Sequence, residues 1–221
     1  MPATLYLVRH GRTMFNEKRV IQGWCDSPLT REGEEQAARV GRYFAHEGVF
    51  FDHAYASTLA RTHQTIEAIT DMPYGREPGL REWFFGAYEG ERVDLMPARP
   101  WGDYFVQFGG EGEREFHARI CSTLREIMAR PGHENVLVVS HGSACREFML
   151  EWREGQDLGY PDVPGNCSVM RYTFDGERFE LVRVVEQDEM RAVLGEQGAW
   201  CCCGVQPVCR VAVSADNRCL L

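Results

Sequence analysis

Positive charge is scarce in this chain of 221 residues. Lys and Arg together number 24, against 33 Asp and Glu, so the formal net charge is −9. Phosphate backbones and anionic headgroups attract clustered positive side chains and are repelled by an acidic surface. We therefore expect no nucleic-acid partner and no membrane partner, and an anionic small molecule would need a local basic pocket.

Long apolar segments are also missing. No run of about 18 apolar residues occurs, and the N-terminus lacks a basic region followed by an apolar one. Because 44% hydrophobic and 26% charged residues are ordinary for a globular domain, we expect a soluble, cytoplasmic protein with one main domain. The sequence carries no signal for its oligomeric state.

Cysteine pairs at the spacing of structural zinc sites are missing too. Four of the nine cysteines are scattered, and the other five lie between residues 201 and 219, where no histidine accompanies them. Zinc binding is therefore disfavoured, and so is a prenyl anchor, because Cys219 is followed by two residues where a prenylation signal needs three. We expect reduced thiols, a catalytic domain over residues 1–186 and a cysteine-rich appendage over residues 187–221.

Two short apolar runs each end at a polar triplet that contains a histidine. Residues 4–8 are followed by Arg9-His10-Gly11, and residues 136–139 are followed by Ser140-His141-Gly142. Short runs that are apolar throughout are typical of buried strands. Ligands of open α/β sheets bind beyond the carboxyl ends of the strands, so both histidines stand where a ligand site is expected.

Apolar residues recur at helical spacing between and after these runs. The four series are Ala37, Val40, Gly41, Phe44 and Ala45 after Thr30; Leu59, Ile66 and Ile69 after Ser57; Phe116, Ile120, Leu124 and Ile127; and Ala144, Phe148 and Trp152 after His141. Ser57 is the expected N-cap of the second helix. Residues 50–56 predict another strand, and residues 168–174 with 179–185 predict a hairpin that turns at Asp175-Gly176. This alternation predicts a three-layer α/β sandwich with a mostly parallel central sheet, helices on both faces and one antiparallel edge strand.

Two segments, residues 11–29 and 86–110, show neither helical nor strand periodicity. Long irregular segments in compact domains are usually functional or disordered. The second segment carries five aromatic residues, Tyr88, Trp101, Tyr104, Phe105 and Phe108. We expect residues 86–110 to form an insertion that walls or covers a pocket, with an ordinary surface loop as the alternative.

Arginine and histidine side chains supply groups that phosphate ester chemistry needs. Hydrolysis of a phosphate monoester requires stabilised negative charge, an in-line nucleophile and a proton for the leaving oxygen. Arg9 and Arg61 carry planar, permanent charges that can hold two phosphoryl oxygens each, so we expect no metal ion and no other cofactor. Their charge disfavours a protonated imidazole, which leaves His10 neutral and nucleophilic.

Four motifs, in sequence order, resemble the signatures of the histidine phosphatase superfamily and span residues 5–146. The first contains Leu7-Val8-Arg9-His10-Gly11-Arg12-Thr13, Asn16, Gln22-Gly23-Trp24, Asp26-Ser27-Pro28-Leu29-Thr30 and Gly33. The others are Ser57-Thr58-Leu59-Ala60-Arg61-Thr62; Leu80-Arg81-Glu82 with Phe85-Gly86 and Glu89-Gly90; and Ser140-His141-Gly142.

The resemblance implies a phosphatase that acts on a phosphorylated small molecule through a phosphohistidine. His10 would accept the phosphoryl group, while Arg9, Arg61 and His141 surround its oxygens. Glu82 would protonate the leaving oxygen and then draw a proton from the attacking water, for which its pKa would need to be raised. The other residues that would line this pocket are Gly11, Asn16, Gln22, Gly23 and Gly142.

Neighbouring charges bear on the choice of acid and of substrate. Glu77, Glu89 and Glu91 lie near Glu82 in the sequence and are its rivals as proton donor. Arg12 stands where the family often has an acidic residue. It places a further positive charge by the pocket mouth, which indicates a substrate with a second anionic group.

A cofactor-dependent phosphoglycerate mutase is the nearest alternative, because it belongs to the same family. Such mutases carry a tyrosine just after the acid, a lysine beyond it and an arginine pair in a longer insertion. This chain has Phe85 at the tyrosine position, no lysine after Lys18 and no adjacent arginines in residues 86–110. Hydrolysis is therefore the preferred interpretation. A catalytically idle relative that binds a phosphorylated ligand is disfavoured because His10 and Glu82 are both present.

Overall fold

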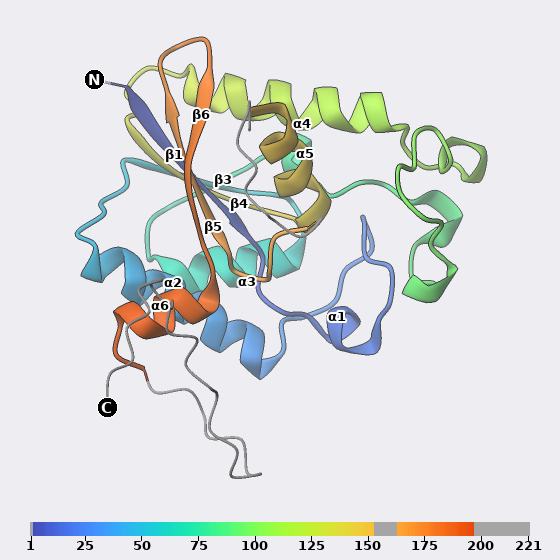
Figure 1. The fold of residues 1–221 in the computed structure, drawn as a ribbon, viewed down its shortest axis with the longest axis horizontal. Coiled ribbons are helices and arrows are strands. Elements are labelled where there is room, and N and C mark those ends of the chain that lie inside the picture. Colours follow the sequence, from blue (N-terminus) through green and yellow to red (C-terminus); the bar gives the residue numbers. More distant parts are fainter. Residues whose placement is uncertain (1, 153–162, 197–221) are drawn as a thin grey trace, which may run out of the picture.

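The computed structural model describes residues 2–152 and 163–196, in which a central sheet lies between layers of helices (Figure 1). The strands are β1 (Ala3–Arg9), β2 (His53–Ala56), β3 (Gly75–Arg76), β4 (Asn135–Ser140), β5 (Val169–Phe174) and β6 (Phe179–Val185). The helices are α1 (Met14–Lys18), α2 (Arg31–His46), α3 (Ala60–Ile69), α4 (Glu113–Met128), α5 (Gly142–Trp152) and α6 (Gln187–Val193).

The sheet has the order β3-β2-β4-β1-β5-β6. Strands β1 to β4 pair in parallel, whereas β5 is antiparallel to both β1 and β6. The prediction of a mostly parallel sheet with an antiparallel edge is confirmed. The reversed strand β5 lies one place inside the edge, because its hairpin partner β6 occupies the edge itself.

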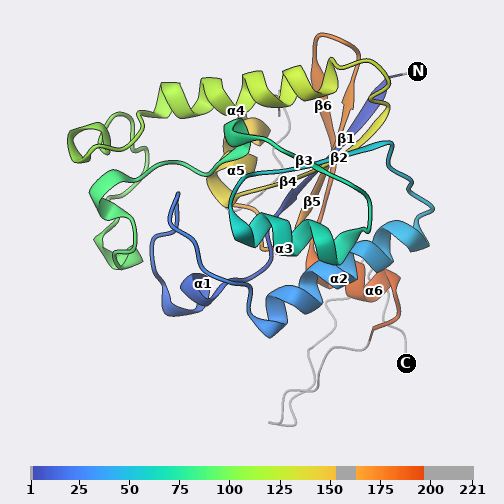
Figure 2. The same cartoon turned by 180° about the vertical axis from the view of Figure 1, so that it is seen from behind.

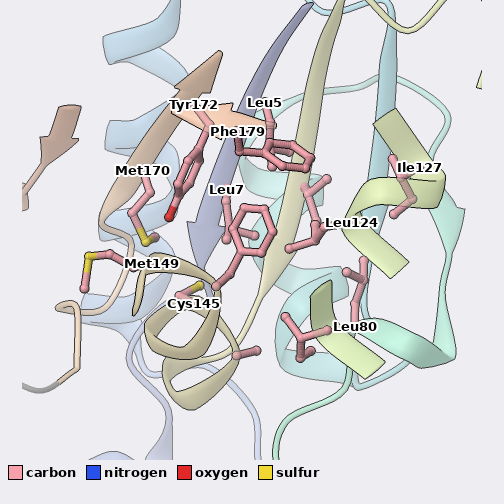
Figure 3. Close-up of a cluster of buried hydrophobic side chains, with 14 of the residues drawn as sticks. Leu5, Leu7, Leu80, Leu124, Ile127, Cys145, Met149, Met170, Tyr172 and Phe179 are labelled. Carbon is pink, nitrogen blue, oxygen red and sulfur yellow. The ribbon is translucent and has the colours of Figure 1, made fainter. Parts of the chain in front are cut away.

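Alternate side chains of the central strands face opposite helical layers. Leu5 and Leu7 of β1 pack with α4 and α5, in the cluster that Figure 3 shows, whereas Tyr6 and Val8 pack with α2, α3 and α6. Seen from both sides, α4 and α5 lie across the sheet from α2, α3 and α6 (Figures 1 and 2). The three-layer sandwich is therefore confirmed, and β1 and β4 lie at its centre.

Polar caps fix where the helices of one layer begin. Thr30 caps α2, since its hydroxyl accepts the N–H of Gly33 at 3.1 Å. The prediction that Ser57 caps α3 is wrong: the helix begins after Leu59, and the carboxylate of Asp26 accepts the N–H of Ala60. The buried Ser57 hydroxyl has no hydrogen-bond partner among the described residues. A long-range carboxylate thus replaces the local cap.

Residues 86–110 contain the 3-10 helices Gly86–Tyr88, Val93–Leu95 and Val106–Phe108 and a single β-bridge from Arg92 to Val20. Trp101 and Phe105 pack on Trp83, with ring centroids at 5.3 and 6.3 Å, and Phe105 is fully buried. Trp83 in turn stacks on Phe116 of α4 at 4.8 Å. These aromatic rings attach the insertion to the core beside α4.

The described part of residues 187–221 begins with α6, which packs on α2 and buries Met190. Glu196, just beyond it, forms ion pairs of 2.7 Å with Arg39 and with Arg42 of α2. The cysteines between residues 201 and 219 lie outside the described residues. Within residues 2–152 and 163–196, no helix is both long enough and apolar enough to span a bilayer.

Candidate active site

The two histidines that follow strands meet at the carboxyl edge of the sheet. β1 and β4 are adjacent, with Arg9 opposite Ser140, and the N–H of His10 donates to the Ser140 carbonyl at 2.9 Å. The rings of His10 and His141 have centroids 5.4 Å apart and planes inclined by 60°. The structure therefore brings together the two imidazoles that the sequence placed at equivalent strand ends.

The hydrogen bond of His10 fixes which of its nitrogens carries a proton. Nδ1 lies 2.8 Å from the carbonyl oxygen of Gly11, and a carbonyl can only accept, so Nδ1 is the donor. In the neutral ring, Nε2 then holds the lone pair. Burial, followed by the charges of Arg61 and Arg9, holds the pKa of His10 well below its ordinary value of 6.5, although the bond to Gly11 acts in the opposite direction. His10 is thus a neutral imidazole with a nucleophilic Nε2.

His141 has the opposite arrangement. Its Nδ1 accepts a hydrogen bond of 3.1 Å from Nε of Arg61, so its proton resides on Nε2. That Nε2 is buried and has no hydrogen-bond partner among the described residues. Burial and then the charge of Arg61 hold the pKa of His141 well below 6.5. His141 therefore offers one fixed, unpaired N–H donor.

Arg61 is fully buried at the start of α3 and is nearly saturated with acceptors. Besides His141, it donates to the carbonyls of Gly23 and Cys25 at 2.7 and 3.0 Å and to the carboxylate of Asp26 at 3.0 Å. Four of its five N–H groups are thereby used. Among the described residues one N–H has no acceptor, so in this conformation Arg61 cannot make the two-oxygen contact that the sequence predicted; its contacts orient His141 and the loop at residues 23–26.

Arg9 approaches the same edge from the end of β1. One of its terminal nitrogens donates to the carbonyl of Pro164 at 2.6 Å, while its buried Nε has no partner among the described residues. Gly142 lies directly against this guanidinium: a Cβ at that position would be 3.2 Å from both Cζ and Nε of Arg9. Glycine at position 142 therefore makes room for the arginine beside the first turn of α5.

The carboxylate of Glu82 is bound at the N-terminus of α5, beside His141. Its two carboxylate oxygens accept the backbone N–H groups of Trp83 and Ser143, each at 2.9 Å, and the residue is buried. Burial raises the pKa of Glu82, and the two N–H groups and then the charges of Arg61 and Arg9 oppose that rise. A raised pKa favours the protonated form that a general acid needs.

The three rival carboxylates lie in other environments. Glu77 pairs with Arg130 at 2.7 Å, and Glu91 is exposed. Glu89 accepts four backbone N–H groups, at distances between 2.8 and 3.1 Å, from residues 23, 24, 25 and 85. It therefore ties two loops of the site together. Of these four glutamates, Glu82 is the one bonded beside His141, at the first turn of α5.

Two glycines of the first motif permit close backbone contacts. A Cβ on Gly11 would lie 2.6 Å from the carbonyl oxygen of Gly33, and one on Gly23 would lie 2.2 Å from a carboxylate oxygen of Glu89. The N–H of Gly23 is bound by Glu89, so Gly23 contributes its carbonyl to Arg61 and not a free N–H. The loop conformation around the site therefore depends on both glycines.

Asn16 and Gln22 belong to a polar network beside His10. Asn16 accepts the N–H of Thr13 at 3.1 Å, and Gln22 accepts the Thr13 hydroxyl at 2.7 Å. Asn166, which the sequence did not single out, donates to the carbonyl of His10 at 3.0 Å and contacts Asn16 at 3.3 Å. Asn166 thus supports the backbone of His10.

The positive charge of Arg12 is already compensated. Arg12 lies 2.7 Å from a carboxylate oxygen of Glu32 and 3.8 Å from one of Glu17, and its side chain is 40% exposed. The structure therefore gives no support to Arg12 as the receptor of a second anionic group. Across residues 2–152 and 163–196, no group of three or more His, Cys, Asp or Glu side chains is arranged to hold a metal ion.

Curated relatives carry two kinds of name. A broad-specificity phosphatase of Saccharomyces cerevisiae is 31% identical over 194 residues, which cover 81% of this chain and 84% of the yeast protein. A 2,3-bisphosphoglycerate-dependent phosphoglycerate mutase of Rhizobium etli is 34% identical over 68% of this chain and 79% of its own length. Similarity in sequence therefore extends to both phosphatases and mutases.

Solved structures share the fold. Bacillus stearothermophilus YhfR matches with a TM-score of 0.70 and 31% identity, over 81% of this chain and 95% of that one. A phosphoglycerate mutase from Bacillus anthracis matches with a TM-score of 0.75 and 24% identity, over 87% and 96%. The family profile of the histidine phosphatase superfamily (branch 1) matches residues 5–187. The chain therefore belongs to the histidine phosphatase superfamily, a family of enzymes.

Proposed function

We propose that this chain is a metal-independent phosphomonoesterase that hydrolyses a small phosphorylated metabolite through a phosphohistidine on His10. The complementary hydrogen bonding of the two adjacent imidazoles is the observation that supports this most directly. This bonding leaves the lone pair on Nε2 of His10, as a nucleophile needs, and the proton on Nε2 of His141, which has no partner among the described residues and can donate to a phosphoryl oxygen.

The reaction would take two balanced steps. In the first, His10 Nε2 forms a bond to phosphorus, the bond from phosphorus to the leaving oxygen breaks, and Glu82 gives its proton to that oxygen. In the second, water attacks phosphorus and gives a proton to the Glu82 carboxylate as the phosphorus–nitrogen bond breaks. Inorganic phosphate leaves, and both His10 and protonated Glu82 are restored.

Negative charge on the phosphoryl group would be stabilised by donors that the fold already holds in place. Among the described residues, Nε of Arg9 and Nε2–H of His141 have no acceptor, and further N–H groups of Arg9 and one of Arg61 are left for the phosphoryl oxygens. Such preorganised donors are worth most in a buried site, where water does not compete. Two guanidinium charges are the proposed substitute for a metal ion.

Hydrolysis is favoured over phosphoryl transfer to a second hydroxyl. Phe85, at the position of the mutase tyrosine, is 4% exposed and packs on Phe105 at 5.0 Å, so this position offers an apolar ring to the core and no hydroxyl to a substrate. The mutase names among the relatives make transfer the activity to test alongside.

The test is turnover of p-nitrophenyl phosphate by chelator-treated protein, with phosphate release as the readout. Chelator-resistant hydrolysis with an acid-labile phosphoenzyme is expected. His10→Ala should abolish both, and His46→Ala, whose side chain is 52% exposed, is the matched control. Near-normal turnover by His10→Ala would show that His10 is not the nucleophile. Activity that needs a bisphosphoglycerate primer would indicate a mutase, and binding without turnover an idle relative.

The natural substrate is a separate question. A panel of phosphorylated metabolites ranked by kcat/KM addresses it, since that ratio measures discrimination in the transition state. We expect one small phosphate ester to exceed the others, and equal values across the panel would contradict a dedicated metabolite phosphatase.

A further inference from the structure

We infer that Arg119 and Glu111 together position Glu82 as the proton donor, an inference that rests on the proposed function. Neither residue belongs to the four motifs of the sequence. Both lie beside the segment of residues 79–84 that carries Glu82, Arg119 on α4 and Glu111 just before it.

Arg119 uses all five of its N–H groups. It donates to the carbonyls of Gly79, Arg81 and Glu82 at 2.9, 2.9 and 3.1 Å. Its other two N–H groups bind both carboxylate oxygens of Glu111, at 2.8 and 2.7 Å. Five donors thus meet five acceptors in the planar geometry that only a guanidinium provides. A lysine, with three donors on one nitrogen, could not serve them all.

Glu111 holds the other side of the same segment. Its carboxylate accepts the N–H of Phe84 at 2.9 Å, and its backbone N–H donates to the Phe84 carbonyl at 2.9 Å. Its own carbonyl accepts the indole N–H of Trp83 at 2.8 Å. The residues on both sides of Glu82 are therefore fixed by this ion pair, whose side chains are 20% and 11% exposed.

This arrangement matters because Glu82 must meet two demands at once. Its carboxylate bonds to Ser143 on α5 and to the adjacent Trp83 N–H, and its proton must also reach the leaving oxygen. Small displacements of a catalytic group, on the order of 1 Å, can cost about 100-fold in rate. Arg119 and Glu111 do not contact the reacting atoms, so they act as positioning residues through the backbone of Glu82.

The test compares esters with different leaving groups. A phenolate leaves readily without a proton and an alkoxide does not, so loss of a correctly placed acid slows alkyl phosphates more than aryl phosphates. Arg119→Met should raise the aryl-to-alkyl ratio of kcat/KM by about tenfold or more. Arg114→Met is the matched control: it removes the same charge from an exposed position of the same helix and should leave the ratio unchanged.

A merely structural role predicts a different result. If Arg119→Met only lowered the fraction of folded enzyme, both substrates would slow equally and the ratio would stay at the wild-type value, which would overturn the inference. Should Arg119→Met fail to fold, Arg119→Lys keeps the charge and loses donors, and the same rise in ratio is expected of it. An unchanged ratio in that variant would count equally against the inference.

Glu82→Gln separates this inference from the proposed function. If Glu82→Gln leaves the aryl-to-alkyl ratio unchanged, Glu82 is not the acid and the proposed function fails in that step. If Glu82→Gln raises the aryl-to-alkyl ratio and the Arg119 variants do not, Glu82 is the acid and only the inference that Arg119 positions it is wrong.

Discussion

The hydrogen bond from Arg61 to His141 allows charge and geometry to be varied separately. Arg61→Lys keeps a positive charge but has no N–H equivalent to Nε, so Nδ1 of His141 loses its partner and can take up the proton itself. Arg61→Met removes both the charge and the donors. The two variants should therefore differ in their pH dependence, although both are slower than wild type.

The expected magnitude follows from the contacts. A hydrogen bond from a charged donor contributes about 1.5–3 kcal/mol, which corresponds to a loss of roughly 10- to 150-fold in kcat/KM for Arg61→Lys. The loss of contacts to Gly23, Cys25 and Asp26 adds to this figure.

The pH dependence has a definite sign. Activity needs neutral His10 and is lost as pH falls through its pKa, which burial and the charge of Arg61 hold well below 6.5. Removing that charge in Arg61→Met should raise the pKa of His10 and move the acid limb of kcat/KM to higher pH. Arg61→Lys should leave the acid limb close to that of wild type. Because burial is the larger cause, the shift in Arg61→Met is partial.

Two measurements test this reasoning. Profiles of kcat/KM against pH locate the acid limb, and nitrogen NMR shifts of the His141 ring report which nitrogen is protonated. Thermal melts identify any loss of folded protein. An acid limb that is identical in wild type, Arg61→Lys and Arg61→Met would refute the effect of Arg61 on His10. A His141 ring that stays protonated on Nε2 in Arg61→Lys would refute the tautomer argument.

Three further predictions concern other residues of the site. Glu82→Gln should abolish the basic limb of kcat/KM, because wild-type activity is lost as pH rises through the raised pKa of Glu82. A basic limb that persists in this variant would show that another group causes the loss of activity. Gly11→Ala should destabilise the fold by about 1–3 kcal/mol in urea titration, since its Cβ would lie 2.6 Å from the Gly33 carbonyl oxygen, and an unchanged midpoint would contradict this. Cys25 should react slowly with iodoacetamide at pH 8, because burial and then Glu89 raise its pKa to about 12. At that pKa about one thiol in ten thousand is ionised. Labelling at the rate of an unhindered cysteine would contradict this prediction.

Local sequence patterns were sufficient to predict that His10 and His141 lie together at one edge of the sheet. Two apolar runs that end in a histidine predicted two buried parallel strands, and adjacent parallel strands place their carboxyl ends together. The structure pairs β1 with β4 and brings His10 within 5.4 Å of His141, measured between ring centroids. This inference succeeded because strand polarity and burial are encoded within a few residues.

Contacts between distant segments were not predictable in the same way. Asp26 caps α3 across 34 residues and displaces the expected cap Ser57, and Asn166 supports His10 across 156 residues. Nothing in the local sequence of either residue indicates its partner. The hydrogen bonds of Arg61 could not be predicted either, because the carbonyls that accept them belong to a loop whose sequence shows neither helical nor strand periodicity.

The central position of β1 also constrains how the protein is made. Leu5 pairs with Val136 on one side and with Tyr172 on the other, so β1 waits for partners that lie far downstream in the chain and leave the ribosome much later. Pairings between such distant segments form slowly, since a long loop must be closed first. A nascent chain that ends before β4 carries His10 without the imidazole of His141, so the proposed phosphate site should form late in translation.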